Sequence, residues 1–237
     1  VEVAGGSLSG MIFNPIAAAK SVLTRNQKDL GAVVVDIGFG TTGLAVYQEG
    51  KLIHTSSFHI GGGHVTNDIA IGLRTSIGAA EQAKFSFGSA LAKEVPIREM
   101  IELSKFDATA RGQVTRRFLS EIIESRLTEI FEFIHNDLRA IGRSGQLPAG
   151  AVLVGGGAKL PAIVDLAIQE LRLPVRVGVP DVNSVVTETS DVSQTLEDPE
   201  YACALGLVHW GADKMAREDK GFGLMDKVRN LAKYFMP

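Results

Sequence analysis

The sequence VVVDIGFGTTGLAVY, from Val33 to Tyr47, decides the fold that we expect for this chain. Three β-branched residues lead into Asp36, a turn with two glycines follows, and a second apolar segment begins at Leu44. This pattern predicts a buried β-hairpin whose tip is polar and rich in glycine. Glycine lets backbone N–H groups approach an anion closely, and a carboxylate beside a phosphate is typical of a metal ion or its water shell. An ordinary β-turn is the alternative interpretation of the same residues.

Length and composition describe a globular protein without a strong charge bias. The chain has 237 residues, which suits one large domain or two small ones, and its net charge of −3 does not indicate nucleic-acid binding. Cys203 is the only cysteine, so no intramolecular disulfide forms, and the five histidines lack metal-ligand spacing. No apolar run is long enough to span a membrane. The chain begins without Met and without a signal peptide, so we expect it to be part of a longer protein.

The remaining sequence predicts alternating strands and helices. Outside the hairpin we expect strands over 52–58, 151–154 and 175–177, and helices over 14–23, 66–73, 78–86, 113–141, 160–171 and 199–210. Pro15 is placed at the first turn of its helix, and Thr66 is expected as an N-cap. Residues 24–30 are expected to form a polar connection.

Two further stretches have residues suited to a nucleotide. Glu81 and Lys84 stand one turn apart on an expected helix, so both project from one face; an exposed ion pair worth a few tenths of a kcal/mol is the alternative. Three glycines, Gly155–Gly157, separate an expected strand from an expected helix. Such a turn presents backbone N–H groups to an anion or nucleotide.

The last residues predict an amphipathic helix over 222–237, after a charged, glycine-containing linker over 212–221. Its apolar stripe and basic side suit either the surface of an anionic membrane or docking on a protein. The residues expected at the membrane are Phe222, Leu224, Met225, Lys227, Val228, Arg229, Leu231, Lys233 and Phe235.

Taken in order, four motifs resemble the second half of an actin-like ATPase, the fold shared by actin and the Hsp70 chaperones. NPIAAAKSVL and PEYACALGLVHW are similar to the two connecting helices, the hairpin to the second phosphate-binding hairpin, and AVLVGGGAKLPAI to the adenosine motif. In detail the match is closest to the FtsA family of bacterial cell-division proteins, over residues 11–237. The resemblance implies an α/β fold: an actin-like (ribonuclease H-like) mixed sheet flanked by helices, with a small inserted α/β subdomain and a C-terminal amphipathic helix.

The same resemblance implies a domain organisation. Residues 1–32 would be the remnant of a first large domain with its connecting helix, and 33–63 together with 114–211 the second large subdomain. Residues 64–113 would form the small inserted subdomain, followed by the linker 212–221 and the membrane-targeting helix 222–237.

It also implies an ATP site with Mg²⁺. The hairpin backbone would meet the phosphates, and Asp36 would face the magnesium ion through water. Glu81 and Lys84 match positions at the ribose and adenine, the glycine triplet would admit the base and ribose, and Lys159 would cover the adenine face. The nucleotide-binding residues implied are Asp36, Gly38, Gly40, Thr41, Thr42, Glu81, Lys84, Gly155, Gly156, Gly157 and Lys159.

Three departures from the pattern of relatives bear on turnover. Phe39 replaces a glycine or acidic residue at the hairpin tip, and its ring could either crowd the phosphates or pack outward. Asn14 stands where relatives have a glutamate near the attacking water, and Gly43 where an acidic residue is common. An amide orients water but is a poor general base, so we expect nucleotide binding with at most weak ATPase activity.

The function implied is that of an actin-like protein that polymerises on the cytoplasmic face of the bacterial inner membrane at the division septum. Its partners would be FtsZ, docking on the small inserted subdomain, further copies of itself, other division-ring proteins and the anionic membrane. The alternatives are an Hsp70-type ATPase or sugar-kinase relative of the same fold, and a pilus-assembly scaffold similar to FtsA.

Overall fold

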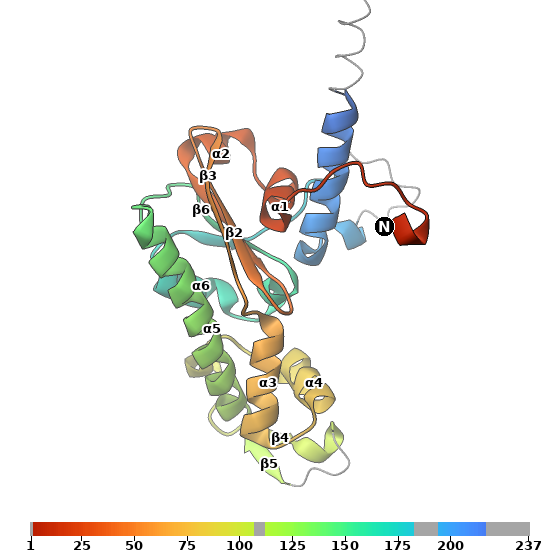
Figure 1. Ribbon diagram of the computed structural model, residues 1–237. Coiled ribbons are helices and arrows are strands. Elements are labelled where there is room, and N and C mark those ends of the chain that lie inside the picture. Colours follow the sequence, from red (N-terminus) through yellow and green to blue (C-terminus); the bar gives the residue numbers. More distant parts are fainter. Residues whose placement is uncertain (1, 107–111, 183–193, 217–237) are drawn as a thin grey trace, which may run out of the picture.

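The computed structural model describes residues 2–106, 112–182 and 194–216, and a five-stranded mixed sheet forms its centre (Figure 1). The strand order is β3-β2-β1-β6-β7. The strands are β1 (Ala32–Ile37), β2 (Thr42–Gln48), β3 (Lys51–Phe58), β6 (Gly150–Val154) and β7 (Val175–Val177). β2 runs antiparallel to both β1 and β3, whereas β6 lies parallel to both β1 and β7. The hairpin, the mixed sheet and the α/β class predicted from the sequence are confirmed.

The central strand β1 is buried on both faces, which explains its run of three consecutive valines, Val33–Val35. Val33, Val35 and Ile37 belong to the core cluster beneath α5 (Arg116–Ala140) and α6 (Ile163–Leu171). Ala32 and Val34 belong to the opposite cluster, beneath α1 (Asn14–Val22) and the helix of residues 202–216. Figure 1 shows these helices covering the two faces of the sheet.

Several expected boundaries are wrong for local reasons. Residues 24–30 are not a plain connection, because Thr24 and Gln27 form a capping box that begins α2 (Arg25–Leu30). α3 (Gly62–Leu73) begins at the glycine triplet, so Thr66 lies inside the helix. The long helix α5 begins only at Arg116, after the short strand β5 (Gln113–Thr115), and α6 begins at Ile163. In each case a capping or turn residue sets the boundary, which hydrophobic periodicity does not report.

A second group of elements lies beyond the hairpin end of the sheet. It contains α3, α4 (Ile77–Phe87) and the two-stranded sheet of β4 (Met100–Glu102) and β5, beside the first turns of α5 (Figure 1). Asp68 of α3 accepts hydrogen bonds from Arg126 of α5 at 2.5 and 3.0 Å. α5 therefore joins this group to the main sheet. The chain also has short 3-10 turns: η1 (Glu2–Ala4), η2 (Ala92–Glu94), η3 (Leu103–Lys105), η4 (Gly156–Lys159) and η5 (Pro199–Tyr201).

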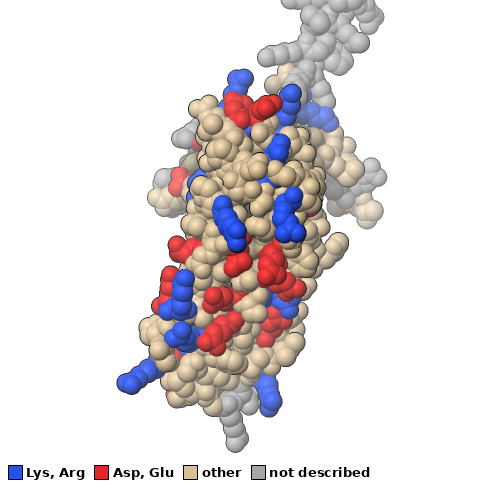
Figure 2. Space-filling model, turned by 90° about the vertical axis from the view of Figure 1, so that its left-hand side faces the viewer, with Lys and Arg blue, Asp and Glu red and all other residues tan. Residues whose placement is uncertain are grey.

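Figure 2 shows acidic and basic side chains intermixed on the face turned to the viewer. Some are paired along α5, as Arg117 is with Glu121, which agrees with the small net charge. Within the described ranges, none of the helices combines the length and the apolar character that crossing a bilayer needs. The helix that begins at residue 202 continues to 216, into the range expected as a linker, and the expected amphipathic helix over 222–237 lies outside the described residues.

Candidate functional site

The tip of the β1–β2 hairpin is a tight polar turn. The Gly38 amide donates to the Thr41 carbonyl at 2.9 Å, and a Cβ atom at Gly38 would lie 3.1 Å from that oxygen. A Cβ atom at Gly40 would meet nothing within 4 Å. The tip therefore has a closed backbone, with open space in front of Gly40.

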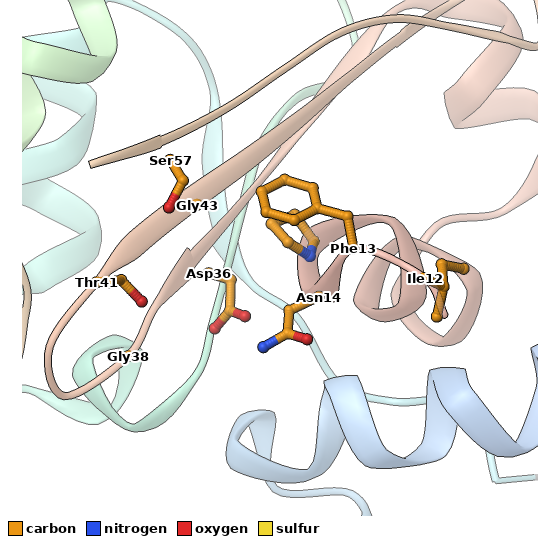
Figure 3. A pocket seen from close by; sticks show the side chains of 9 residues that line it. Ile12, Phe13, Asn14, Asp36, Gly38, Thr41, Gly43 and Ser57 are labelled. Carbon is orange, nitrogen blue, oxygen red and sulfur yellow. The ribbon is translucent and has the colours of Figure 1, made fainter. Parts of the chain in front are cut away.

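A pocket of about 280 Å³ opens beside this tip, between the hairpin and the start of α1. Its lining residues are Ile12, Phe13, Asn14, Pro15, Asp36, Gly38, Thr41, Gly43 and Ser57. In Figure 3 the Asp36 carboxylate and the Asn14 amide point into the same open space, and the Thr41 hydroxyl lies on its far side. The structure thus brings together four predicted site residues from two separate segments: Asn14, Asp36, Gly38 and Thr41.

Asp36 is the electrostatic centre of the pocket. Burial raises the pKa of its carboxyl group, since the charged form loses hydration. Among the described residues, no hydrogen bond or ion pair is found for its side chain. Burial, followed by the charge of Asp36, also raises the pKa of the Cys203 thiol. A partly desolvated carboxylate without a partner favours the arrival of a cation.

Gly43 explains how α1 reaches the pocket. A Cβ atom at this position would lie 2.7 Å from Cγ of Pro15, so the missing side chain lets the first turn of α1 lie against β2. Ser57 faces the same place because β3 pairs Ser57 with Gly43. Sequence reasoning missed Ser57, Ile12, Phe13 and Pro15 as lining residues. The strand register of β3 was the signal for Ser57, since it lies opposite a residue of the hairpin motif.

Thr42 and Phe39 have structural contacts outside the pocket. The buried Thr42 hydroxyl donates to the Ile60 carbonyl at 2.8 Å. Phe39 is 72% exposed, and a Cβ atom at Gly63 would lie 2.8 Å from its ring. The ring therefore lies over the first turn of α3 and does not line the pocket, which resolves the alternative left open by the sequence.

The second glycine turn packs against β1. A Cβ atom at Gly155 would lie 2.6 Å from both an Asp36 carboxylate oxygen and the Ile37 carbonyl, and Gly155 has φ of +82°. A Cβ atom at Gly157 would lie 2.4 Å from the Ile37 side chain. The triplet therefore lies directly behind the Asp36 side chain, and only glycine satisfies both the packing and the backbone angle at Gly155.

Lys159 forms ion pairs with the chain segment that precedes the last described helix. Its ammonium lies 2.6 Å from the Asp198 carboxylate and 3.1 Å from that of Glu200. The hydrogen bond with Asp198, and then that with Glu200, raises the pKa of Lys159. Lys159 is 45% exposed on its side chain, and Glu200 reaches to 3.4 Å from the position of a Cβ atom on Gly156. These contacts tie η4 to η5 at the rim of the glycine turn.

Glu81 and Lys84 do not line the pocket. They form an ion pair of 2.8 Å on α4, and the exposed pair considered from the sequence is wrong for Lys84, which is buried. The pair contacts the first turns of α3 through Gly62 and Thr66. The structure therefore places these two residues against the first turns of α3, next to the glycine triplet Gly61–Gly63.

The pocket offers a cation one carboxylate, that of Asp36, so most ligands of a bound cation would be water or phosphate oxygens. The described ranges contain no cluster of three or more His, Cys, Asp or Glu side chains that could hold a metal ion. Asp36 alone suits a contact through water, which magnesium allows because it keeps several waters and takes phosphate oxygens as ligands.

Comparisons with known proteins agree on one family. The family model described as "Cell division protein FtsA" matches residues 33–206. The FtsA protein of Pseudomonas aeruginosa is 36% identical over 216 residues, which are 91% of this chain and 50% of that protein. The chain therefore spans about half the length of the curated relatives that it matches.

Solved structures agree on the fold. MreB5 of Spiroplasma citri bound to AMPPNP is 19% identical with a TM-score of 0.68, over 88% of this chain and 60% of MreB5. The same protein bound to ADP is 17% identical with a TM-score of 0.71, over 92% of this chain and 64% of that one. At this level of identity the comparison establishes an actin-like fold.

Proposed function

This chain belongs to the FtsA family of cell division proteins, and on that premise we propose that it is the part of a division protein that binds ATP with Mg²⁺ and attaches filaments to the membrane. The observation that carries the proposal is Asp36, a partly desolvated carboxylate without a partner among the described residues, at a glycine-rich turn. A magnesium–nucleotide complex supplies the positive charge and the phosphate oxygens that such a turn suits. The solved MreB5 structures with AMPPNP and ADP support this for the fold.

The backbone of Gly38, Gly40 and Thr41 would hold the phosphates, and Asp36 would hold the magnesium ion through water. The pocket of about 280 Å³ is slightly smaller than the usual range for ligand sites, which begins at about 300 Å³. A pocket of this size suits part of a nucleotide, with the rest of the site supplied by the half of the protein that this chain lacks relative to its relatives.

The glycine triplet Gly155–Gly157 and Lys159 would face the ribose and base, and Glu81 would hydrogen-bond the ribose. Thr42 supports the site from behind, because its hydroxyl joins β2 to the loop before α3. Lys84, which forms an ion pair with Glu81 on α4, would flank the base.

Asn14 shares the pocket with Asp36, which suits a residue that orients a water molecule near the phosphates. An amide does not accept a proton from water at neutral pH, so hydrolysis would be slow. ATP would then act chiefly as a ligand that favours one conformation and the assembly that goes with it.

The partners proposed are FtsZ on the small inserted subdomain, further copies of the chain, other division-ring proteins and the anionic inner membrane at the septum. Family membership supports the division-ring role. The amphipathic sequence of residues 222–237, outside the described residues, supports the membrane contact. One short helix binds weakly, so polymerisation would add avidity.

Titration calorimetry of Gly40→Val in the full-length protein tests the nucleotide site. A side chain at Gly40 has free space, so the fold should be preserved while the branched group blocks the phosphates. We expect affinity for magnesium–ATP to fall by about a hundredfold, as when two charge-assisted hydrogen bonds are lost. Gly211→Val is the control, since that position is also open. Wild-type affinity in Gly40→Val would refute the assignment.

Vesicle co-sedimentation of the full-length protein tests the membrane contact. Deleting residues 222–237 should abolish binding to vesicles with anionic lipid. Replacing Lys227, Arg229 and Lys233 by Gln should weaken binding while keeping the apolar stripe, by about 1 kcal/mol for each basic residue lost. Neutral vesicles are the control. Unchanged binding after the deletion would remove the tether from the proposal.

A further inference from the structure

The first N–H groups of α3 bind the tip of the β1–β2 hairpin. A helix leaves its first N–H groups without partners inside the helix, and those of α3 meet carbonyl groups of the hairpin turn. The Gly62 amide donates to the Gly38 carbonyl at 2.9 Å, and the Gly63 amide donates to the Phe39 carbonyl at 2.7 Å. A Cβ atom at Gly61 would lie 2.5 Å from the Gly38 oxygen, so the two backbones are in direct contact. We call Gly38, Phe39, Gly62 and Gly63 the tip contact.

The tip contact sets the direction of the free N–H groups of the hairpin turn. A planar trans peptide places its N–H group opposite its C=O group. The carbonyls of Gly38 and Phe39 face α3, so the amides that follow them, those of Phe39 and Gly40, are turned away from α3. Among the described residues no acceptor is found for either amide, and a Cβ atom at Gly40 would meet nothing within 4 Å. The turn therefore presents two N–H donors on its open side.

The Phe39 ring packs on the tip contact. A Cβ atom at Gly63 would lie 2.8 Å from Cζ and 2.9 Å from Cε1 of the ring, so the ring lies directly on the backbone of α3. Phe39 is 72% exposed, so only about a quarter of its surface is covered. That fraction of a phenylalanine is about 50 Å² of apolar surface, which favours the closed tip contact over an open one by about tenfold.

We propose that Phe39 is a positioning residue whose ring holds the hairpin tip against the first turn of α3 in the free protein. By keeping two carbonyls on α3, the ring keeps the amides of Phe39 and Gly40 turned to the open side. This role in the free protein stands on the contacts of Phe39 alone. Its effect on ligand affinity rests on the nucleotide site proposed above, in which the Gly40 amide would meet a phosphate oxygen without prior rearrangement.

Hydrogen exchange of single amides in the nucleotide-free, full-length protein tests the tip contact directly. In Phe39→Ala the amides of Gly62 and Gly63 should exchange about tenfold faster, because the contact opens more often, while amides of β1 keep their wild-type rates. Phe39→Leu retains an apolar side chain and should give rates between those of Phe39→Ala and the wild type. Wild-type rates at both glycine amides in Phe39→Ala would overturn the proposal.

Phe118→Ala is the matched control. Phe118 lies in the first turn of α5, in the same group of elements as α3, and is 43% exposed, so it covers more of its surface than Phe39 does. We expect wild-type exchange at Gly62 and Gly63 in this variant. Faster exchange there would mean that loss of any phenyl ring in this group of elements loosens α3, and would overturn the specific role of Phe39.

A double-mutant cycle with Gly63→Ala tests the ring contact through stability. In the wild type the added methyl group must displace the ring, whereas in Phe39→Ala only the carbonyl oxygen of residue 39, at 3.0 Å, stands in its way. The helix propensity of alanine contributes equally in both backgrounds and cancels. Gly63→Ala should therefore raise the unfolding constant in urea about tenfold more in the wild type than in Phe39→Ala. Equal changes in the two backgrounds would show that the ring does not pack on Gly63, against the proposal.

Calorimetry with magnesium–ATP distinguishes positioning from direct contact with the ligand. A ligand that needs the closed tip binds in proportion to the closed fraction, so Phe39→Ala should bind more weakly by up to about tenfold. Phe118→Ala should bind as the wild type does. A loss of about a hundredfold, or any loss in Phe39→Ala with unchanged exchange, would show that the ring acts on the nucleotide itself and would overturn the proposal. If the wild type binds no magnesium–ATP, the proposed nucleotide site fails, and exchange and the cycle still decide the role of Phe39.

Discussion

Gly206 is the point of closest approach between the two helices that cover one face of the sheet. A Cβ atom at this position would lie 1.8 Å from the carbonyl oxygen of Ala17 and 2.3 Å from its carbonyl carbon. These atoms belong to the backbone of α1, so no change of rotamer relieves the contact. Gly206→Ala should therefore force α1 and the helix of residues 202–216 apart.

The cost follows from how far the helices must move. Carbon and oxygen atoms without a bond need roughly 3.2 Å or more, so the separation must grow by more than about 1 Å. Such overpacking costs about 1–3 kcal/mol, and we expect the upper end because Ser21 also loses its 2.7 Å hydrogen bond to the Ala202 carbonyl. The higher helix propensity of alanine offsets up to about 1 kcal/mol of this loss in the free energy of unfolding.

Gly211→Ala is the control that separates the steric clash from the change in helix propensity. Gly211 lies in the same helix, and a Cβ atom there would meet nothing within 4 Å. This variant should be about 0.5–1 kcal/mol more stable than the wild type. Urea denaturation of both variants is fitted with one shared value of m, the slope of the free energy of unfolding against urea concentration. Gly206→Ala should be less stable than Gly211→Ala by about 2–3 kcal/mol.

Two variants of equal stability would refute the reasoning, because the helices would then not touch at Gly206. Gly206→Ala should also affect the pocket. Asn14 and Pro15 begin α1 and line the pocket, so displacing α1 should also weaken any ligand bound there.

Three further outcomes follow from the site. Burial raises the pKa of Asp36, so the folded protein holds this proton more tightly than the unfolded chain, and stability attributable to this group falls as pH rises through its folded pKa. Asp36→Asn should therefore be more stable than wild type at pH 7, with the difference vanishing in acid; thermal unfolding across pH checks the sign. Gly157→Ala should lose about 1–3 kcal/mol in urea denaturation, because its Cβ would lie 2.4 Å from the Ile37 side chain. Lys159→Met should change stability by less than about 1 kcal/mol, because the ion pairs are half exposed, yet weaken ATP in calorimetry if the side chain covers the base; unaltered ATP affinity would remove Lys159 from the site.

The sequence predicted the central architecture because strand patterns are local. The run before Asp36 is β-branched throughout, and that pattern suits a strand buried on both faces whatever the neighbours are. Helix boundaries were less predictable. Gln27 turns residues 25–30 into α2 by closing a capping box with Thr24, a two-residue effect inside a polar stretch that has no hydrophobic period.

The candidate site was predictable in part. Asp36, Gly38 and Thr41 lie in one motif, and Asn14 lines the same pocket, as the resemblance implied. Ser57 was not predictable from its own residue type, because it reaches the pocket only through the register of β3. The position of the Phe39 ring over Gly63 also depends on where α3 begins, which the sequence placed four residues too late.

By itself the sequence determined the strands of the main sheet, the glycine turns and the family, since these depend on the order of residues and on backbone conformations that few residues adopt. The tertiary structure decided which polar groups meet. Lys84 has the spacing of a surface ion pair with Glu81, yet it lies buried against Gly62 and Thr66 from another helix. The physical reason is that an ammonium group has only three donors, and the packing of α3 on α4 fixes which acceptors use them.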